Sequence, residues 1–384
     1  MSAAQDCIAR ASAPAQDADV TGRLARGLGP GPFALVMLFV SPRADVARIA
    51  AETAARLPAA HVVGCTTAGE ISEAGYDEGA VLALGFPSRL FAAEVLELTD
   101  LDRLSRSAAA AAFLQLRQDL AGAQAHLPHE FALLLVDGLS LCEDDLASAL
   151  AVGSGHVPLI GGSAGDGLRF RETLVLHRGR ALRNAAVLSV LRGLCPVRAL
   201  NMDHLHPTER RMVVTRADPA ARIVQRINAE PAAREYARIL GKDPALIDYL
   251  TFAAHPLAVR VGGRYHVRAV QRVLPSGELL FFSAIDAGVV LALTEPEDLP
   301  AHLDRRLSQL AGPVPPVAVL GFDCVLRRIE AEQKQLGGAV SKVLRRHRVW
   351  GFSTYGEQFG PLHVNHTLTG CAIYPPGTQL AEPG

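Results

Sequence analysis

The sequence predicts an α/β (α+β) fold, in which repeated strand-helix-strand-strand modules form two sheet-containing lobes with helices packed on them. Three segments share one plan: an apolar strand, a turn, a helix, and a short apolar strand that runs into a turn with an acidic residue. They begin at Phe33, Phe131 and Val317, and their turns read GCTTAGE, GGSAGD and GFSTYGE. Strand-sized apolar runs and Ala-rich runs with helical spacing support this plan. Similar lengths and similar ends indicate one supersecondary unit used three times.

Each turn is followed by another apolar run of strand length. These runs lie at 79–86, 184–191 and 366–374. Helical spacing recurs between the modules, at 104–123, 219–240 and 297–311. The stretch 200–212 has no clean period, so we expect an irregular connection there.

The length of 384 residues exceeds what one ordinary hydrophobic core accommodates, and therefore predicts more than one domain. We expect two modules in the N-terminal domain and one in the C-terminal domain. The predicted parts are a flexible N-terminal segment at 1–29, an N-terminal domain at 30–205, a C-terminal domain at 206–376 and a tail at 377–384.

Charge and composition exclude several function classes. The 38 basic and 39 acidic side chains nearly cancel, so no whole-chain field attracts nucleic acid or an anionic membrane. No apolar run has the length of a signal peptide core or a membrane span, which predicts a soluble, cytoplasmic protein. The six cysteines are scattered without any C-x-x-C pair, so neither a zinc knuckle nor a disulfide framework is indicated.

The three turns are the main candidates for a binding site. Gly lets the chain bend there, and Ser or Thr hydroxyls cap the amides that the bend frees. One interpretation is a set of polar loops that converge on one small ligand. The other is a set of tight turns whose side chains satisfy their own backbone. The candidate ligand-binding residues are Thr66, Thr67, Glu70, Ser163, Asp166, Thr354, Glu357 and Asn365.

Catalysis is the least supported function class. Cys65 lies in the first turn, but Gly162 takes its position in the second unit and Phe352 in the third. A thiol nucleophile also needs a base, and no neighbour in the sequence identifies one. We therefore expect no catalytic residue and no enzyme activity, and keep as an alternative a hydrolase that uses Cys65 or a turn hydroxyl.

Histidines offer a second kind of site. His204 and His206 lie two residues apart and His363 and His366 three apart, but no further pair is spaced to complete the four ligands of a structural zinc. His255 stands in the mostly apolar stretch TFAAHPLAV. Such a histidine is either a hydrogen-bonded core residue or an imidazole presented to a haem iron. As metal ligands we rank His255 first, His204 second and His366 lower, because polar neighbours of His366 indicate loop-to-strand hydrogen bonding.

Five motifs occur in one order along the chain: VVGCTTAGEI, IGGSAGD, RMVVTRADPAARIVQRINAEPAAREYARILG, FAAHPLAV and GFSTYGEQFGPLHVNHTLTG. Over residues 30–376 they resemble the FIST family, with its N- and C-terminal parts. The resemblance implies a cytoplasmic sensory protein of bacterial signalling rather than an enzyme, whose modules bind small ligands. For a branch similar to this chain, it implies haem b, a response to nitric oxide, and action on a histidine kinase or a cyclic-di-GMP enzyme. Residues 30–376 hold only FIST parts, so we expect that partner to be a separate protein.

Two ligand hypotheses follow. A haem-based gas sensor uses His255, with Arg260, Arg268 and Arg272 as partners of the haem propionates. A metabolite-binding module instead holds an amino-acid-like ligand among the polar turns. The segment QFGPLHVNH at 358–366 has no counterpart in the other two turns. We therefore expect this segment, together with Glu357, to form one wall of the ligand site.

Overall fold

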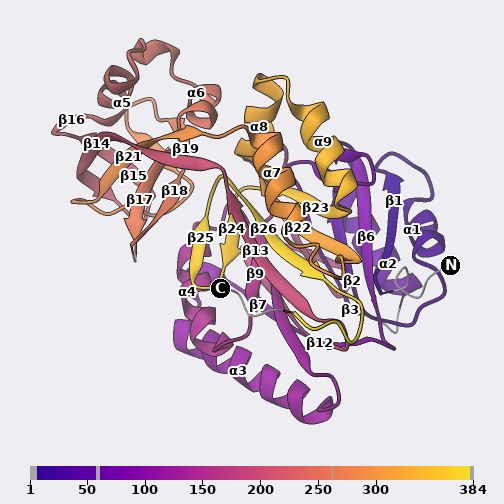
Figure 1. Cartoon of the computed structure of the whole chain (residues 1–384). Coiled ribbons are helices and arrows are strands. Elements are labelled where there is room, and N and C mark those ends of the chain that lie inside the picture. The colour runs from indigo at the N-terminus through magenta and orange to yellow at the C-terminus, as the bar shows by residue number, and fades with distance from the viewer. Residues whose placement is uncertain (1–6, 58–60, 262, 381–384) are drawn as a thin grey trace.

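The computed structural model describes residues 7–57, 61–261 and 263–380, and it confirms a mixed α/β fold with 27% helix and 40% strand. Figure 1 shows a large core lobe and a smaller lobe that stands to one side of it. Three six-stranded sheets belong to the core lobe, and an eight-stranded sheet belongs to the smaller lobe.

The first of three successive units in the core lobe begins close to the N-terminus. It contains β1 (Ala9–Pro14), α1 (Val20–Leu28), β2 (Phe33–Val40), α2 (Val46–Arg56), β3 (His61–Thr66), β4 (Glu70–Ser72), β5 (Gly75–Asp77) and β6 (Ala80–Pro87). The segment 1–29, predicted to be flexible, is thus folded from Ala9 onward. Residues 1–6 of that segment and 381–384 of the predicted tail lie outside the described residues.

The second and third units repeat this order of elements. The second contains β7 (Phe91–Thr99), the short 3-10 helix η2 (Leu101–Arg103), α3 (Arg106–Ala123), β8 (His129–Val136), α4 (Glu143–Ser154), β9 (Leu159–Ser163), β10 (Val175–His177), β11 (Arg180–Leu182) and β12 (Ala185–Gly193). The third contains β13 (Val197–Asp203), α7 (Leu299–Ser308), β22 (Ala318–Cys324), α8 (Val325–Gln333), α9 (Gly337–Arg346), β23 (Val349–Thr354), β24 (Glu357–Phe359), β25 (Leu362–Val364) and β26 (Thr367–Ile373). The helices predicted at 104–123 and 297–311 are confirmed as α3 and α7.

Within each unit, the two strands that flank the helical segment pair in parallel, and the last strand pairs antiparallel with the first of them. The pairs are β2 with β3 and β6, β8 with β9 and β12, and β22 with β23 and β26. Between the second strand of the parallel pair and the last strand, each unit contains a two-stranded hairpin. The predicted strand-helix-strand-strand module therefore exists three times, with a hairpin inserted in each copy.

The three units exchange these hairpins in a ring. Hairpin β4–β5 of the first unit pairs with β23 of the third. Hairpin β10–β11 of the second pairs with β3 of the first, and hairpin β24–β25 of the third pairs with β9 of the second. Each six-stranded sheet thus combines four strands of one unit with two of another.

Hydrogen bonds between main chains also join the three polar turns to one another. Ala68 N donates to Ser353 O at 2.8 Å, and Ser353 N donates to Gly69 O at 2.7 Å. Ser163 N donates to Gly356 O at 2.8 Å. The ring is closed by Gly165 N, which donates to Thr66 O at 3.0 Å. The turns therefore converge, as one of the two sequence interpretations expected, and they satisfy each other's backbone.

Strand alternation explains how the core lobe is packed. In β2, Leu35, Met37 and Phe39 face a central cluster shared by all three units, whereas Val36, Leu38 and Val40 face α1 and α2. A side-chain period of two places alternate residues on opposite faces of a sheet. β8 divides its side chains in the same way, between the central cluster and α3 and α4. The helices consequently cover the outer faces of the sheets.

The smaller lobe, here called the inserted lobe, interrupts the third unit between β13 and α7. It consists of β14 (Leu205–Asp218), β15 (Ile223–Ile227), β16 (Glu230–Pro231), α5 (Ala232–Leu240), η3 (Pro244–Leu246), α6 (Tyr249–Ala254), β17 (Leu257–Val261), β18 (Arg264–Arg268), β19 (Val270–Val273), β20 (Leu279–Phe281) and β21 (Val290–Pro296). Its two connections to the core pair with each other, at Leu205 and Pro296. This paired crossing is the neck of the inserted lobe.

Two expectations for this region were wrong. Residues 200–212 are not irregular, because they lie in β13 and β14 and leave only His204 between the strands. The predicted helix 219–240 is a helix only from Ala232, since β15 and β16 precede it. The predicted C-terminal domain 206–376 is also divided: its first part forms the inserted lobe, and its last part returns to the core lobe.

In the part of the chain that the structure describes, no helix combines the length and the apolar character needed to cross a lipid bilayer.

The ring of turns predicts a strict requirement for a small residue at position 165. A Cβ on Gly165 would lie 2.8 Å from the Ala68 backbone nitrogen, so Gly165→Ala forces two turns apart. We expect the free energy of unfolding to fall by about 1–3 kcal/mol, measured by urea denaturation. The matched control is Gly122→Ala in α3, where a Cβ meets nothing within 4 Å. Equal stability of the two variants would contradict the interlocking of the turns.

Candidate functional site

Glu70 and Glu357 occupy equivalent positions in the first and third turns. Thr67 Oγ1 donates to one oxygen of Glu70, and Ala80 N donates to the other at 3.1 Å. In the same manner Thr354 Oγ1 donates to one oxygen of Glu357, and the Thr367 hydroxyl donates to the other at 2.7 Å. Both carboxyls are fully buried. Burial raises the pKa of Glu70 to about 7 and that of Glu357 to about 8.

Asp166 does not match these two glutamates. Its carboxylate accepts hydrogen bonds from the backbone of the following loop, including Phe170 N at 2.8 Å and Arg171 N at 2.9 Å. It also accepts the Tyr355 hydroxyl from the third turn. Because residues 167–174 are inserted before β10, the acid of the second turn organises a loop instead of entering the equivalent position.

The hydroxyls of Thr66 and Ser163 are also occupied by protein groups, whereas the Ser353 hydroxyl in the third turn has no partner among the described residues. Thr66 Oγ1 accepts from Leu174 N at 3.0 Å, and Ser163 Oγ accepts from Gln358 Nε2 at 2.9 Å. The structure therefore brings the predicted turn residues together, but their side chains hold the three turns in place. A ligand has few free partners among them.

Unused hydrogen-bonding atoms gather instead in the segment 358–366, which the sequence singled out. Gln358 Oε1, His363 Nε2, Asn365 Nδ2 and both ring nitrogens of His366 are buried and have no partner among the described residues. Buried polar groups in folded proteins are nearly always paired, so a group of unpaired ones calls for a ligand or ordered water.

Two of these atoms converge beside Gly356. A Cβ at this position would lie 2.6 Å from His363 Nε2 and 3.0 Å from Asn365 Nδ2. Gln358 Nε2 lies 3.3 Å from His363 Nδ1. Since an amide NH₂ donates, Nδ1 accepts and Nε2 carries the proton. The Asn365 oxygen accepts from Ser283 Oγ at 3.1 Å, which leaves its NH₂ free. The site thus presents two unused donors side by side.

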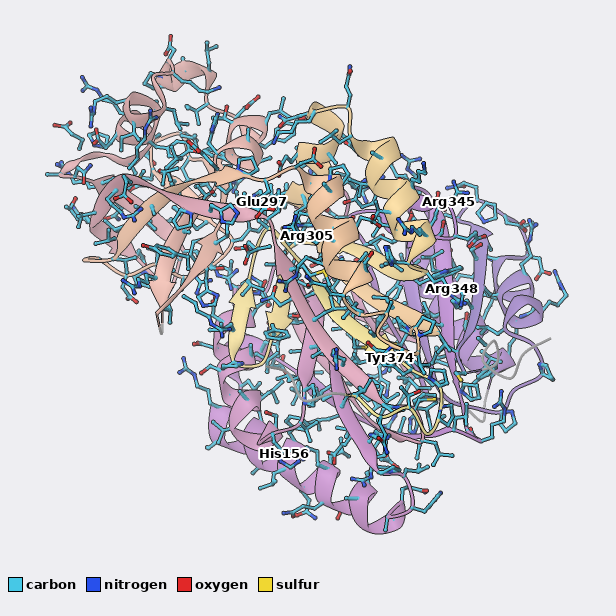
Figure 2. All side chains as sticks on the ribbon, viewed as in Figure 1. His156, Glu297, Arg305, Arg345, Arg348 and Tyr374 are labelled. Carbon is cyan, nitrogen blue, oxygen red and sulfur yellow. The ribbon has the colours of Figure 1, made fainter. Side chains whose placement is uncertain are left out.

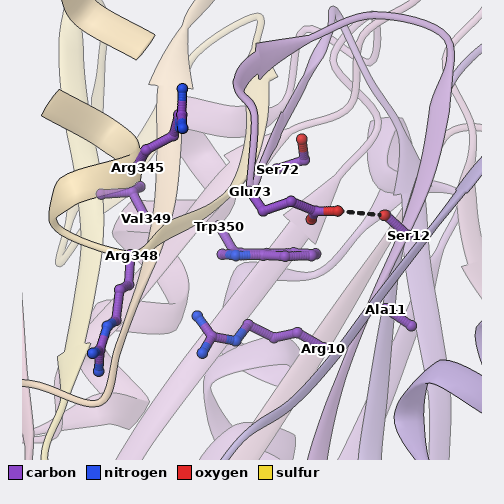
Figure 3. Close-up of a pocket in the computed structure, with 9 residues that line it drawn as sticks. All are labelled: Arg10, Ala11, Ser12, Ser72, Glu73, Arg345, Arg348, Val349 and Trp350. Carbon is purple, nitrogen blue, oxygen red and sulfur yellow. Dashed lines mark hydrogen bonds between the residues drawn. The ribbon is translucent and has the colours of Figure 1, made fainter. Parts of the chain in front are cut away.

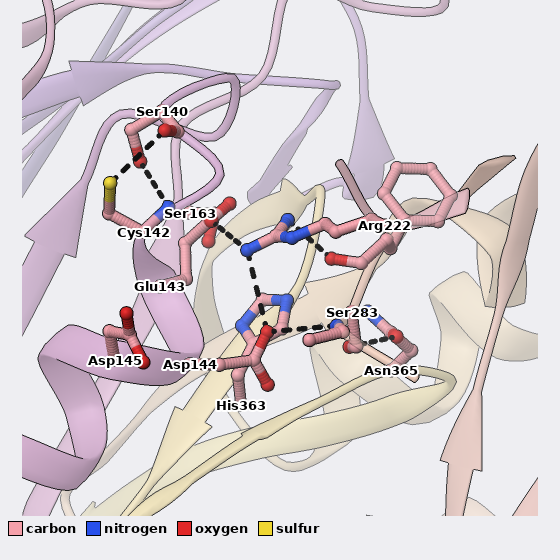
Figure 4. A network of polar contacts seen from close by, with 12 residues as sticks. Ser140, Cys142, Glu143, Asp144, Asp145, Ser163, Arg222, Ser283, His363 and Asn365 are labelled. Carbon is pink, nitrogen blue, oxygen red and sulfur yellow. Dashed lines mark hydrogen bonds and ion pairs between the residues drawn. The ribbon is translucent and has the colours of Figure 1, made fainter. Parts of the chain in front are cut away.

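The inserted lobe and α4 complete the surroundings of these donors. Arg222 donates to Glu143, to Asp144 at 3.4 Å and to the Phe282 carbonyl at 2.5 Å. Arg268 Nη1 donates to the His363 carbonyl at 3.0 Å. Figure 4 shows the contacts of Arg222 in this network, together with Ser283, His363 and Asn365. We call it the polar junction, defined as Glu143, Asp144, Ser163, Arg222, Arg268, Ser283, Gln358, His363 and Asn365.

The electrostatics of the polar junction are set by burial. Burial lowers the pKa of His363, and it lowers the pKa of His366 to about 3, so both imidazoles are neutral at neutral pH. For Arg222, burial alone lowers the pKa, but the charges of Glu143 and Asp144 outweigh it and raise the pKa overall. The junction consequently joins the two lobes through a buried ion pair next to neutral hydrogen-bond donors.

Sequence reasoning found Ser163 and Asn365 and the segment that holds Gln358 and His363, and it named Arg268 only as a haem partner. It missed Glu143, Asp144, Arg222 and Ser283. Three acidic residues in a row at 143–145 are an ordinary first helical turn, because they complement the helix dipole. Arg222 stands in a stretch whose spacing predicts a helix, so its contact with α4 was not expected. No local signal joins Arg222 to Glu143, because they lie 79 positions apart.

The histidines ranked for metal binding differ in their surroundings. His204 is fully buried in the neck, with Nε2 at 2.8 Å from Glu330 and Nδ1 at 3.1 Å from Arg327. Neither nitrogen is free for iron. His255 does not stand in a strand but follows α6, and its ring is half-buried. Burial lowers the pKa of His255, so its imidazole is neutral.

Neither position, as the structure shows it, has an apolar pocket of the kind that holds a haem. Among the described residues, His255 lines none of the five cavities described here, and the cavity nearest to it in sequence is lined mostly by polar residues between Asn228 and Pro244. A porphyrin needs an apolar slot beside its axial ligand. Within the described part of the chain, no group of three or more His, Cys, Asp or Glu is arranged to hold a metal ion. We therefore derive no chemistry through an iron centre.

Cys65 lacks the surroundings of a nucleophile. Its side chain is buried in the central apolar cluster, and burial raises the pKa of the thiol well above its usual range. Reactive cysteines stand in electropositive, partly exposed positions that lower this pKa. The thiol stays protonated in this position.

The two buried glutamates predict a specific pH dependence. The folded protein keeps a proton on Glu357 up to pH 8, whereas the unfolded chain releases it near pH 4.5. This stabilisation is fully present below pH 4.5 and is lost as the pH rises toward 8, at about 1.4 kcal/mol per pH unit. Urea denaturation between pH 5.5 and 7.5 should show a shallower decline for Glu357→Gln than for the wild type. Glu78→Gln, which changes an exposed residue, serves as the control and keeps the wild-type slope.

Comparisons with known proteins agree with the order of the motifs. Residues 34–230 match the model of the FIST N domain, and residues 232–360 match that of the FIST C domain. A search of curated proteins gave no match. The two domain models together span most of the described core lobe and the inserted lobe. The chain belongs to the FIST family.

Proposed function

We propose that this protein senses a small polar metabolite, of amino-acid-like chemistry, at the polar junction between the core lobe and the inserted lobe. FIST domains are in general sensor domains of signal transduction. The observation that carries the proposal is the pair of unused donors beside Gly356, His363 Nε2 and Asn365 Nδ2. A ligand that accepts a hydrogen bond from each of these two atoms gives a partner to two buried donors that otherwise have none.

The charges around these donors favour a carboxylate as the accepting group. Arg222 and Arg268 both act on His363 electrostatically, and each belongs to the inserted lobe. Two convergent N–H donors with nearby guanidinium groups suit the two oxygens of a carboxylate. Glu143 and Asp144, which pair with Arg222, also act on His363 electrostatically, and their carboxylates suit an ammonium group. This combination favours an amino acid over a neutral or a purely anionic metabolite.

Access to the site requires the lobes to separate. Seven of the nine residues of the polar junction are buried, and Asp144 and Arg268 are partly exposed. Among the described residues, neither His363 nor Asn365 lines any of the five cavities described here. The inserted lobe is tied to the core by the neck, where Glu297 N donates to His204 O at 2.7 Å, and by the contacts of the polar junction. Glu297 and Arg305 mark the position of the neck in Figure 2. Binding and lobe movement are therefore one event in this proposal.

The signal passes in this proposal to a separate protein, either a histidine kinase or a cyclic-di-GMP enzyme, because these are the partner classes that the family resemblance implies. The two-lobe arrangement supports the proposal, since a ligand that holds the lobes in one position changes the surface that a partner contacts. Haem and nitric oxide sensing stay the alternative. The absorption spectrum of protein purified with haem supplied discriminates the two, because bound haem gives a Soret band.

A thermal-shift screen tests the metabolite proposal. Free amino acids and their carboxylate analogues at millimolar concentration should raise the melting temperature by a few degrees through preferential binding to the folded state. Asn365→Leu removes the free NH₂ and should abolish the shift. Asn201→Leu, in β13 of the core lobe, is the matched control and should keep it. No shift with any amino acid, or a Soret band that disappears in His255→Ala, would refute the proposal.

The buried ion pair predicts how tightly the inserted lobe is held. Arg222→Met leaves Glu143 buried without its cation, which costs about 3–5 kcal/mol. We expect lower stability in urea and a larger radius of gyration in small-angle scattering, because the lobes separate to hydrate Glu143. The double variant Arg222→Met/Glu143→Leu should restore both values. Arg43→Met breaks an exposed pair with Glu78 and should cost less than about 1 kcal/mol. Equal effects of Arg222→Met and Arg43→Met would contradict this account.

A further inference from the structure

A cleft of about 430 Å³ opens where the first unit of the core lobe meets the third, away from every residue of the polar junction. β1 contributes Arg10 and Ser12, the turn between β4 and β5 contributes Glu73, and the segment from α9 to β23 contributes Arg345 and Arg348. Trp350 lies in the middle of the cleft. We call it the arginine cleft, and Figure 3 shows it in close-up.

The arginine cleft carries excess positive charge. Arg345 and Arg348 are exposed, and among the described residues no ion pair or hydrogen bond joins either side chain to an acid. The carboxylate of Glu73 accepts the Ser12 hydroxyl at 3.1 Å. Three arginines and one glutamate therefore line the same cleft.

Two of the arginines repel each other. Burial lowers the pKa of Arg10, and the charge of Arg348 lowers it further, against a weaker opposite effect of Glu73. The Arg10 guanidinium lies over the Trp350 ring, 5.7 Å from its centroid, which holds it in place. Figure 3 shows Arg10 and Glu73 on opposite faces of the indole. An anion between Arg10 and Arg348 relieves this repulsion.

We propose that the arginine cleft binds a small, multiply charged oxyanion, either a phosphate compound or a polycarboxylate, between Arg10 and Arg348. Guanidinium groups recognise both kinds of oxyanion through paired N–H donors. The volume suits a small molecule. Because both faces of the indole are covered, recognition rests on charge and hydrogen bonding, and aromatic stacking of the ligand plays no part. This site is independent of the proposed metabolite site.

Trp350 makes the test direct, because it is the single tryptophan of the chain. Inorganic pyrophosphate and citrate are titrated separately into the full-length protein at constant ionic strength, with tryptophan fluorescence as the readout. We expect a saturable change with at least one of them. Saturation by pyrophosphate alone identifies a phosphate ligand, and saturation by citrate alone identifies a polycarboxylate.

Variants separate specific binding from general attraction. Arg348→Gln should weaken the affinity about tenfold or more, as expected for a lost charged hydrogen bond. Arg346→Gln is the matched control, since Arg346 neighbours the cleft in sequence but pairs with Asp304 at 3.0 Å. If Arg348→Gln fails to fold, as judged by circular dichroism, Arg345→Gln replaces it. A response that does not saturate, or equal weakening in the cleft variant and in Arg346→Gln, would overturn the proposal.

Discussion

The exchange of hairpins between the three units is the constraint on which the core lobe depends. Each six-stranded sheet needs two strands from another unit. The turns that precede the exchanged hairpins must therefore meet at one place. Their backbone groups then bond across units, which explains why Gly, Ser and Thr dominate there. Glu70 and Glu357 satisfy equivalent groups inside this ring and are buried with raised pKa values. Residues that suggest catalysis in the sequence are thus required by the architecture.

The inserted lobe breaks the symmetry of this arrangement. Three equivalent hairpins exist, but the hairpin of the third unit and the segment that follows it pack against the inserted lobe, through His363 and Asn365. The same segment contains most of the buried polar atoms that lack a partner among the described residues. A threefold scaffold therefore supplies rigidity, while one departure from its symmetry supplies a candidate binding site. The unpaired polar atoms thus gather where the repeat is interrupted.

The sequence predicted the modules because strand length, helical spacing and turn composition are local properties. It also identified 358–366 as unusual, because that segment has no counterpart in the other turns. The inserted lobe was misread because Ala and Arg at 219–240 imitate a helix, although Pro231 allows a helix to begin only after it. Asp166 was matched to the glutamates because a loop insertion is invisible in a short motif. Contacts such as Arg222 with Glu143 join distant positions, and no single sequence reveals them.

The hairpin exchange affects how the protein folds while it is being synthesised. When the ribosome has made the first unit, hairpin β4–β5 has no strand to join, since β23 is still to be translated. The sheet of the second unit likewise waits for β24. Unpaired strand edges invite aggregation. Neither family segment, 34–230 or 232–360, contains a complete set of sheets, so folding is completed only when the last strands emerge, and nascent chains need protection until then.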